Sequence, residues 1–143
     1  MNGKWTIGII GGSGLYAIDG LEDAEWRTIE SPWGQPSDQL LFGRVGEVNL
    51  VFLPRHGRGH RISPSELNAR VNIDVLKRAR CTDILAISSI GSLKEELEPG
   101  RFVIVDQFID RTKGRPLSLF DETECWVRVD MTEPFCPNPS HLQ

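Results

Sequence analysis

The residues of this chain best suited to chemistry form a basic segment rich in glycine and histidine, Arg55-His56-Gly57-Arg58-Gly59-His60, which directly follows an apolar run. An arginine guanidinium presents a planar fork of N–H donors that matches phosphate oxygens, and a neighbouring histidine adds a further donor. The chain as a whole is acidic, with 16 Lys and Arg against 20 Asp and Glu, so the segment is a local reversal of charge. It favours an anion site over the alternative of a solvated basic loop.

Two glycine-containing turns with serine hydroxyls follow other apolar runs. They are Gly11-Gly12-Ser13-Gly14 and Ser88-Ser89-Ile90-Gly91. Neither turn contains a carboxylate, and neither does the basic segment. Because ligands of open α/β sheets bind beyond the carboxyl ends of the strands, we expect the three segments to converge. A cluster of donors without a carboxylate suits a dianion such as phosphate.

The elements that must position these segments alternate between strands and a helix. We expect strands at residues 6–10, 39–45, 48–54, 83–88 and 102–108, with the second and third joined by Gly46-Glu47 as a hairpin. The continuous apolar runs predict strands covered on both faces. A helix between two strands predicts a right-handed crossover and a largely parallel or mixed sheet, hence an α/β fold.

The helix is expected to begin at Ser63-Pro64-Ser65-Glu66, which offers a capping oxygen, a proline at the first helical position and a glutamate three residues on. An apolar stripe then recurs at helical spacing, comprising Leu67, Val71, Val75, Leu76 and Ala79.

Other chemistries could also involve these residues. Gly12 to Ala17 satisfies the dinucleotide pattern GxGxxG/A, but that pattern requires a helix to open at once, and Asp19-Gly20 argues against one. The three histidines form no metal-binding pair, so no metal is expected. Asp106 and Asp110 are given no catalytic role. Asp110-Arg111-Thr112 is predicted to be a turn from which Arg111 can reach a substrate or a neighbouring subunit.

Composition excludes several classes of protein. A formal charge of −4 gives no general attraction to nucleic acid or an anionic membrane, so neither is an expected partner. Three cysteines without CxxC spacing indicate neither a disulfide framework nor a zinc ribbon. The short apolar run at residues 7–10 differs from a signal peptide, and no segment is long enough to span a bilayer. We therefore expect a cytoplasmic protein.

The chain resembles the N-terminal half of the 5′-methylthioadenosine phosphorylases, of the trimeric purine nucleoside phosphorylase class. The matching stretches occur in the family's order. They are Ile9-Ile10-Gly11-Gly12-Ser13-Gly14, residues 54–60, Pro64 through Ile73, Gly91-Ser92-Leu93, residues 106–112 and Glu133-Pro134-Phe135-Cys136-Pro137.

The resemblance implies a three-layer α/β fold with a mixed central sheet, of which residues 1–143 are the N-terminal half of one domain. It implies phosphorolysis of 5′-methylthioadenosine to adenine and 5-methylthioribose 1-phosphate, in purine and methionine salvage. Phosphate is then a co-substrate and no cofactor is needed. The implied phosphate-binding residues are Ser13, Arg55, His56, Ser88 and Ser89, with His60 toward the sugar.

In such enzymes the carboxylate that assists departure of the purine belongs to the C-terminal half, so the catalytic residues are expected beyond Gln143. The full-length protein is expected to be a homotrimer. Three positions depart from the family pattern. Ser13 and Ser88 stand where relatives can carry threonine, and Arg128 stands where histidine is expected, which puts the pocket for the 5′-substituent in doubt.

Three hypotheses stay open at this point. The first is a methylthioadenosine phosphorylase fragment, or a relative acting on methylthioinosine or another purine nucleoside. The second is an inactive remnant that retains a phosphate pocket. The third is a dinucleotide-binding domain.

Overall fold

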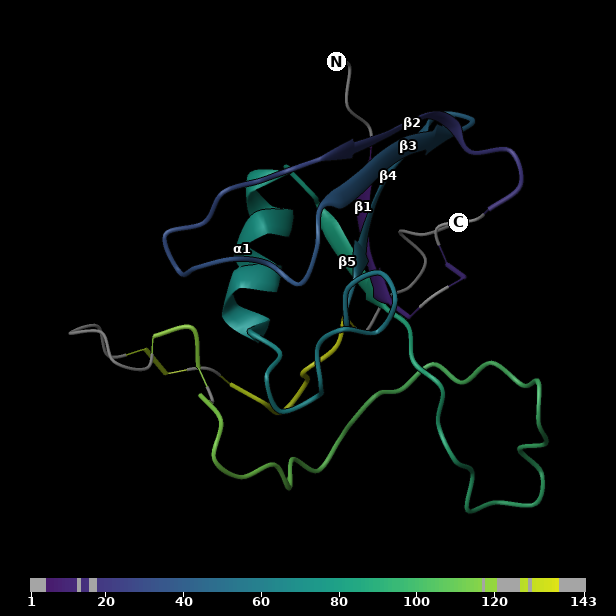
Figure 1. Cartoon of the computed structure of the whole chain (residues 1–143). Coiled ribbons are helices and arrows are strands. Elements are labelled where there is room, and N and C mark those ends of the chain that lie inside the picture. Colours follow the sequence, from purple (N-terminus) through teal and green to yellow (C-terminus); the bar gives the residue numbers. More distant parts are fainter. Residues whose placement is uncertain are drawn as a thin grey trace. The chain divides into compact units, whose positions relative to one another are not determined.

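The computed structural model describes residues 5–12, 14–15, 18–116, 118–120, 127–128 and 130–136, and the chain divides into two compact units, Met1–Ser89 and Ile90–Gln143. The described helix and strands all belong to the first unit (Figure 1). They are β1 Thr6–Gly11, β2 Glu22–Arg27, β3 Leu40–Val45, β4 Val48–Pro54, α1 Ala69–Arg78 and β5 Asp83–Ala86.

The five strands form one mixed sheet in the order β2-β3-β4-β1-β5. β1 runs parallel to both of its neighbours, β4 and β5, whereas β3 is antiparallel to β2 and β4. The predicted hairpin is confirmed: β3 and β4 pair from Val45 and Val48 outward, around Gly46-Glu47. The predicted mixed sheet is confirmed as well, and the connection from β4 through α1 to β5 passes over β1.

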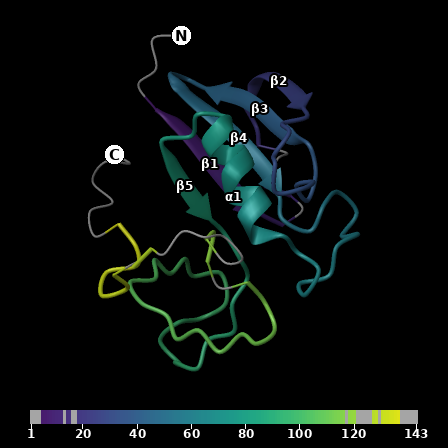
Figure 2. The same cartoon turned by 90° about the vertical axis from the view of Figure 1, so that its left-hand side faces the viewer.

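The core follows from the two-residue period of the strands. α1 covers one face of the sheet (Figure 2). Val51 and Leu53 of β4 pack in one cluster with residues of α1, and Phe52 between them belongs to a separate cluster on the other face. α1 contributes Val71, Val75 and Leu76, all fully buried, so three members of the predicted stripe are confirmed as core. Ile9, Leu41 and Phe52 form the smaller cluster on the opposite face.

The predicted start of the helix is wrong. α1 begins at Ala69, with Asn68 as N-cap accepting a hydrogen bond from the Val71 N–H at 3.2 Å. The pattern at residues 63–66 does form contacts, since Ser63 Oγ donates to Glu66 Oε2 at 2.6 Å. These contacts close a separate turn ahead of the helix, because a capping motif satisfies local donors whether or not a helix follows.

β5 is shorter than predicted and is not covered on both faces. It ends at Ala86, and Ile84 and Leu85 remain 45% and 43% exposed. β5 is the edge strand of the described sheet, so it has a neighbour only on the β1 side. The apolar sequence of β5 predicts burial on both faces. Because β5 is an edge strand, Ile84 and Leu85 are partly exposed instead.

The strand predicted at residues 102–108 is wrong. The described residues of the second unit, which lie between 90 and 136, contain turns but neither helix nor strand. Phe102 is 97% exposed and Ile104 84%. A strand needs a partner for its N–H and C=O groups, and no described segment pairs with this one. The turn predicted at Asp110-Arg111-Thr112 is confirmed, because the Thr112 N–H and Oγ1 both donate to Asp110 Oδ1 at 2.8 Å.

Candidate anion-binding site

The carboxyl ends of β1, β4 and β5 meet at one edge of the sheet, as predicted. Gly11 at the end of β1 is in register with Pro54 at the end of β4, and Ile10 with Ala86 at the end of β5. Backbone hydrogen bonds extend one residue further on both sides: the Arg55 N–H donates to Gly11 O at 2.9 Å, and the Ile87 N–H to Ile10 O at 2.8 Å. The basic segment and the serine turn therefore flank the glycine turn.

The length of its side chain decides which residue can reach from the end of β4 toward the glycine turn after β1. β4 and β5 lie two strand spacings apart, roughly 10 Å, with β1 between them. A serine hydroxyl lies close to its own backbone, whereas an arginine reaches across several ångströms. Arg55 is thus the group able to approach an anion held over the Gly11-Gly12 turn from the β4 side.

Arg55 and His56 are both half-buried and directly bonded to each other. The Arg55 Nε–H donates to His56 Nε2 at 3.2 Å, and His56 Nδ1 lies 3.0 Å from the carbonyl oxygen of Ile62. A carbonyl only accepts, so Nδ1 carries the proton and Nε2 is the acceptor. This tautomer satisfies both contacts, and it leaves the terminal nitrogens of the Arg55 guanidinium available to bind an anion.

His60 lies beside His56. The two rings are stacked, with centroids 6.1 Å apart and planes 11° from parallel. The His60 backbone is left-handed, with φ of 53°, and its N–H donates to Gly57 O at 3.1 Å. The turn that carries His60 therefore closes back on the segment that carries His56.

Only two of the three predicted phosphate-binding serines lie among the described residues. Ser88 and Ser89 directly follow Ile87 and are exposed, so they lie at the edge where they were predicted. Ser13 lies outside the described residues, and its predicted role stays a prediction.

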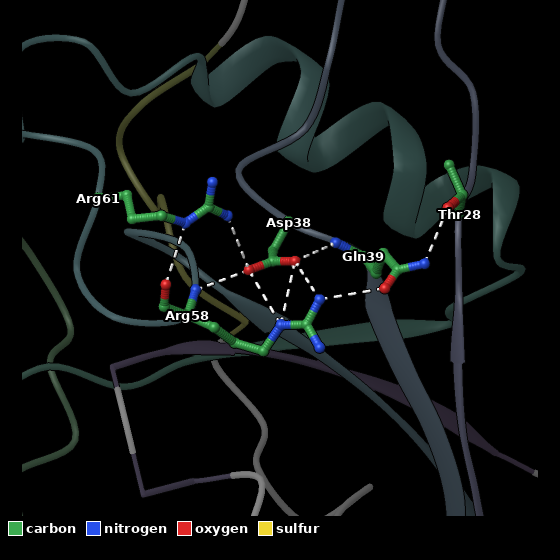
Figure 3. A network of polar contacts seen from close by, with 5 residues as sticks. All are labelled: Thr28, Asp38, Gln39, Arg58 and Arg61. Atoms are coloured by element: carbon green, nitrogen blue, oxygen red, sulfur yellow. Dashed lines mark hydrogen bonds and ion pairs between the residues drawn. The ribbon is translucent and has the colours of Figure 1, made fainter.

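One side chain that contacts the basic segment was not predicted from the sequence. Asp38, just before β3, is buried with 4% of its side chain exposed, and its carboxylate accepts hydrogen bonds from the Arg58 backbone and side chain (Figure 3). Burial alone raises the pKa of this carboxyl, but hydrogen bonds from Arg58 and Gln39 and the charge of Arg58 outweigh that effect and hold the pKa at about 2. No spacing in the sequence distinguishes Asp38 from the other acidic residues.

The alternative of a dinucleotide-binding domain is contradicted. The described residues between β1 and β2 include turns at Gly14-Leu15 and Asp19-Gly20 and no helix, and β2 begins at Glu22. The pyrophosphate of a dinucleotide requires the N-terminus of a helix there.

Among the described residues, no group of three or more His, Cys, Asp or Glu side chains is arranged to hold a metal ion. The described helix, α1, has ten residues and is too short to cross a membrane.

Comparison with known proteins decides between the remaining hypotheses for the fold. Residues 6–142 match the family model of the phosphorylase superfamily. The chain belongs to the phosphorylase superfamily. The mixed sheet is the N-terminal part of the α/β fold of these phosphorylases: a methylthioadenosine phosphorylase from an Antarctic soil metagenomic library superimposes with a TM-score of 0.86 at 44% identity, covering 92% of this chain and 45% of that one.

Other members of the superfamily are similar over the same range. An S-methyl-5′-thioadenosine phosphorylase of Cereibacter sphaeroides is 53% identical over 139 residues, which are 97% of this chain and 48% of the relative. The methylthioadenosine phosphorylase of Schistosoma mansoni in complex with adenine has a TM-score of 0.82 and 45% identity, covering 93% of this chain and 50% of that one. The chain thus spans about half the length of the relatives it matches.

Proposed function

We propose that this phosphorylase, in a form that includes the other half of the fold, cleaves 5′-methylthioadenosine with inorganic phosphate. The observation that carries the proposal is the convergence of Arg55-His56 with the Gly11-Gly12 turn at one sheet edge, through the Arg55–Gly11 hydrogen bond. The names of the relatives support the choice of substrate, since those of Cereibacter sphaeroides and Rhodospirillum rubrum are both S-methyl-5′-thioadenosine phosphorylases.

The proposed reaction transfers the sugar from the purine to phosphate. A phosphate oxygen forms a bond to the anomeric carbon while the bond from that carbon to the purine nitrogen breaks. The bonding electron pair leaves with the purine, which takes up one proton as the phosphate ester gives one up. The products are adenine and 5-methylthioribose 1-phosphate, so the enzyme is a glycosyltransferase.

The residues of this chain supply the phosphate half of that chemistry. Arg55 binds and orients the dianion through its terminal guanidinium nitrogens, because Nε is already bonded to His56. His56 fixes the plane of the guanidinium. Ser13, Ser88 and Ser89 offer hydroxyls from the neighbouring strand ends, and His60 lies on the sugar side. Phosphate is the nucleophile, so neither a metal nor an organic cofactor is part of the proposal.

The other half of the fold contributes the remaining functions in this proposal. It carries the group that protonates the departing purine and the residues that select the base. The whole protein is a cytoplasmic homotrimer with a role in purine and methionine salvage. The exposed faces of Ile84 and Leu85 on β5 support the view that further structure packs there in the complete fold.

A chimera tests the function directly. This chain replaces the matched residues of the Cereibacter sphaeroides relative, which supplies the other half, and the purified chimera is given 5′-methylthioadenosine with and without phosphate. Adenine is followed by chromatography. We expect adenine release that depends on phosphate and appears together with an equal amount of the sugar phosphate. The intact relative is the positive control.

Three results would contradict the proposal. Release of adenine without phosphate would indicate a hydrolase. Faster cleavage of 5′-methylthioinosine than of 5′-methylthioadenosine would give the protein a different base specificity. A folded chimera that is inactive toward both nucleosides would favour the inactive remnant.

A further inference from the structure

The Asp38 carboxylate is buried against the loop that carries the candidate phosphate ligands, and both of its oxygens are occupied by donors. Oδ2 accepts from the Arg58 backbone N–H at 2.7 Å and lies 3.3 Å from Arg61 Nη2. Oδ1 accepts from Arg58 Nη2 and from the Gln39 backbone N–H, each at 2.8 Å. A buried carboxylate so fully bonded fixes the groups around it.

The arginine partner of Asp38 is itself held in place. The Arg58 guanidinium lies over the ring of Trp26, 4.1 Å from its centroid, and donates to Gln39 Oε1 at 3.1 Å. Gln39 in turn donates to Thr28 Oγ1 at 3.1 Å (Figure 3). Arg61 Nε closes the group by donating to the Arg58 carbonyl at 3.1 Å. The network thus ties the loop after β4 to β2 and to the segment before β3.

This anchoring supplements hydrogen bonds that are mostly local to the loop. Gly57 and Gly59 both have left-handed backbones, with φ of 70° and 79°, and Arg58, His60 and Arg61 are exposed. The described backbone bonds within the loop are short-range, from Gly57 N–H to Pro54 O, from His60 N–H to Gly57 O and from Ile62 N–H to His56 O. Arg58 and Arg61 tie the middle of the loop to Asp38, next to the close approach of Gly57 to the Ser37 carbonyl.

Asp38 also divides the three arginines of the loop into two that pair with a carboxylate and one that does not. Arg58 and Arg61 pair with Asp38 at 2.8 and 3.3 Å, whereas no carboxylate among the described residues pairs with Arg55. Without Asp38, two further guanidinium groups within six residues of Arg55 would compete for the same dianion. The buried carboxylate therefore leaves Arg55 as the arginine directed at phosphate.

We propose that Asp38 is a positioning residue of the phosphate site, which holds the Arg55–His60 loop in its binding geometry and withdraws Arg58 and Arg61 from the anion. This inference rests on the proposed function, because it assumes that phosphate is the anion that binds at Arg55. In this proposal Asp38 acts through the loop and its two arginine partners and not by contact with the substrate.

The test compares three forms of the chimera with the Cereibacter sphaeroides relative by phosphate titration, followed through the side-chain and amide NMR signals of residues 54–62 of this chain. Wild type is compared with Asp38→Asn and with the control Asp74→Asn. The control breaks another Asp–Arg pair, that of Asp74 with Arg78 on α1 at 2.6 Å, by the same chemical change. Only signals of folded protein enter the dissociation constant, so a general loss of stability does not change it.

We expect Asp38→Asn to weaken phosphate binding by roughly tenfold or more, as loss of a group that orients a ligand-binding side chain does, and Asp74→Asn to leave it unchanged. Equal or tighter binding by Asp38→Asn would overturn the inference, since released arginines would then bind phosphate on their own. Absence of phosphate binding by the wild type would instead overturn the proposed function, and the positioning role with it.

A second variant decides the matter if Asp38→Asn does not fold. Arg58→Gln removes the guanidinium but keeps the backbone N–H that bonds Asp38. We expect faster hydrogen exchange at the amides of Gly57, His60 and Ile62, together with a weaker phosphate affinity. Exchange and affinity both equal to those of wild type would overturn the inference.

Discussion

The Nε–H of Arg55 donates a hydrogen bond to Nε2 of His56 at 3.2 Å, so these two adjacent side chains after β4 orient each other. His56 is held on its other side by the Ile62 carbonyl at 3.0 Å. The Ile62 carbonyl therefore orients the His56 ring, and the ring orients the guanidinium of Arg55. A guanidinium oriented in this way loses little conformational freedom when it binds an anion.

Arg55 is expected to affect phosphate use and not nucleoside binding. In the chimera with the Cereibacter sphaeroides relative, Arg55→Ala should raise the KM for phosphate by roughly 10- to 100-fold, the effect of one or two charged hydrogen bonds. Arg55→Lys keeps the charge but not the planar pair of donors, so its KM for phosphate should lie between those of the wild type and Arg55→Ala. Steady-state kinetics at varied phosphate measures the effect. Arg78→Ala on α1 is the control, and an unchanged KM for phosphate in Arg55→Ala would remove Arg55 from the site.

The tautomer of His56 is a second expected result. In its neutral form the ring should carry the proton on Nδ1, because an Nε2–H would face the Arg55 Nε–H at 3.2 Å and leave the Ile62 carbonyl without a donor. Nitrogen-15 NMR of the imidazole rings distinguishes the two forms. His60, for whose ring no hydrogen bond is described, should exchange between both tautomers. A dominant Nε2–H form of His56 would contradict the described pairing.

Gly57 is required by backbone conformation and by space. It is buried with φ of 70°, and a Cβ there would lie 3.0 Å from the Ser37 carbonyl oxygen and 3.2 Å from Arg61 Nη2. Gly57→Ala should lower the free energy of unfolding by about 2–4 kcal/mol. The control Gly46→Ala has φ of 58° but no atom within 4 Å of the added Cβ, so it should cost about 1 kcal/mol. Urea denaturation measures both, and equal losses would show that the contacts of Gly57 do not matter.

Asp38 makes the stability of the first unit depend on acid pH. Its pKa is lowered from 3.8 to about 2, so it contributes stability that is complete above pH 4 and is lost as the pH falls through 2. The expected loss is roughly 2 kcal/mol. Urea denaturation from pH 5 to pH 2 measures it, and Asp38→Asn should remove this part of the pH dependence. An equally steep dependence in Asp38→Asn would assign it to other carboxylates.

The sequence predicted which segments meet at the sheet edge, because that depends on local patterns. Apolar strands, glycine turns and a basic segment are each visible within ten residues, and parallel pairing brings their ends together. Asp38 was not predictable, because its role arises from contacts with Arg58 and Arg61 that lie 20 and 23 residues away. The strand expected at residues 102–108 was wrong for a related reason. Its apolar sequence records a preference for burial, but pairing requires a neighbouring strand that no described segment provides.

The start of α1 gives a final test of the same distinction between local pattern and packing. Asn68 caps the helix through Val71 and also donates from Nδ2 to the Trp33 carbonyl at 3.3 Å, whereas the described contacts of the Ser63 hydroxyl are with Ser65 and Glu66 of its own turn. Asn68→Ala should therefore cost about 1 kcal/mol of unfolding free energy, and Ser63→Ala no more than about 0.5 kcal/mol. Urea denaturation of the two variants, with circular dichroism as the probe, measures the difference. A larger loss for Ser63→Ala would mean that the helix in solution begins at the turn indicated by the sequence, because only a cap at residue 63 would make that hydroxyl the more important of the two.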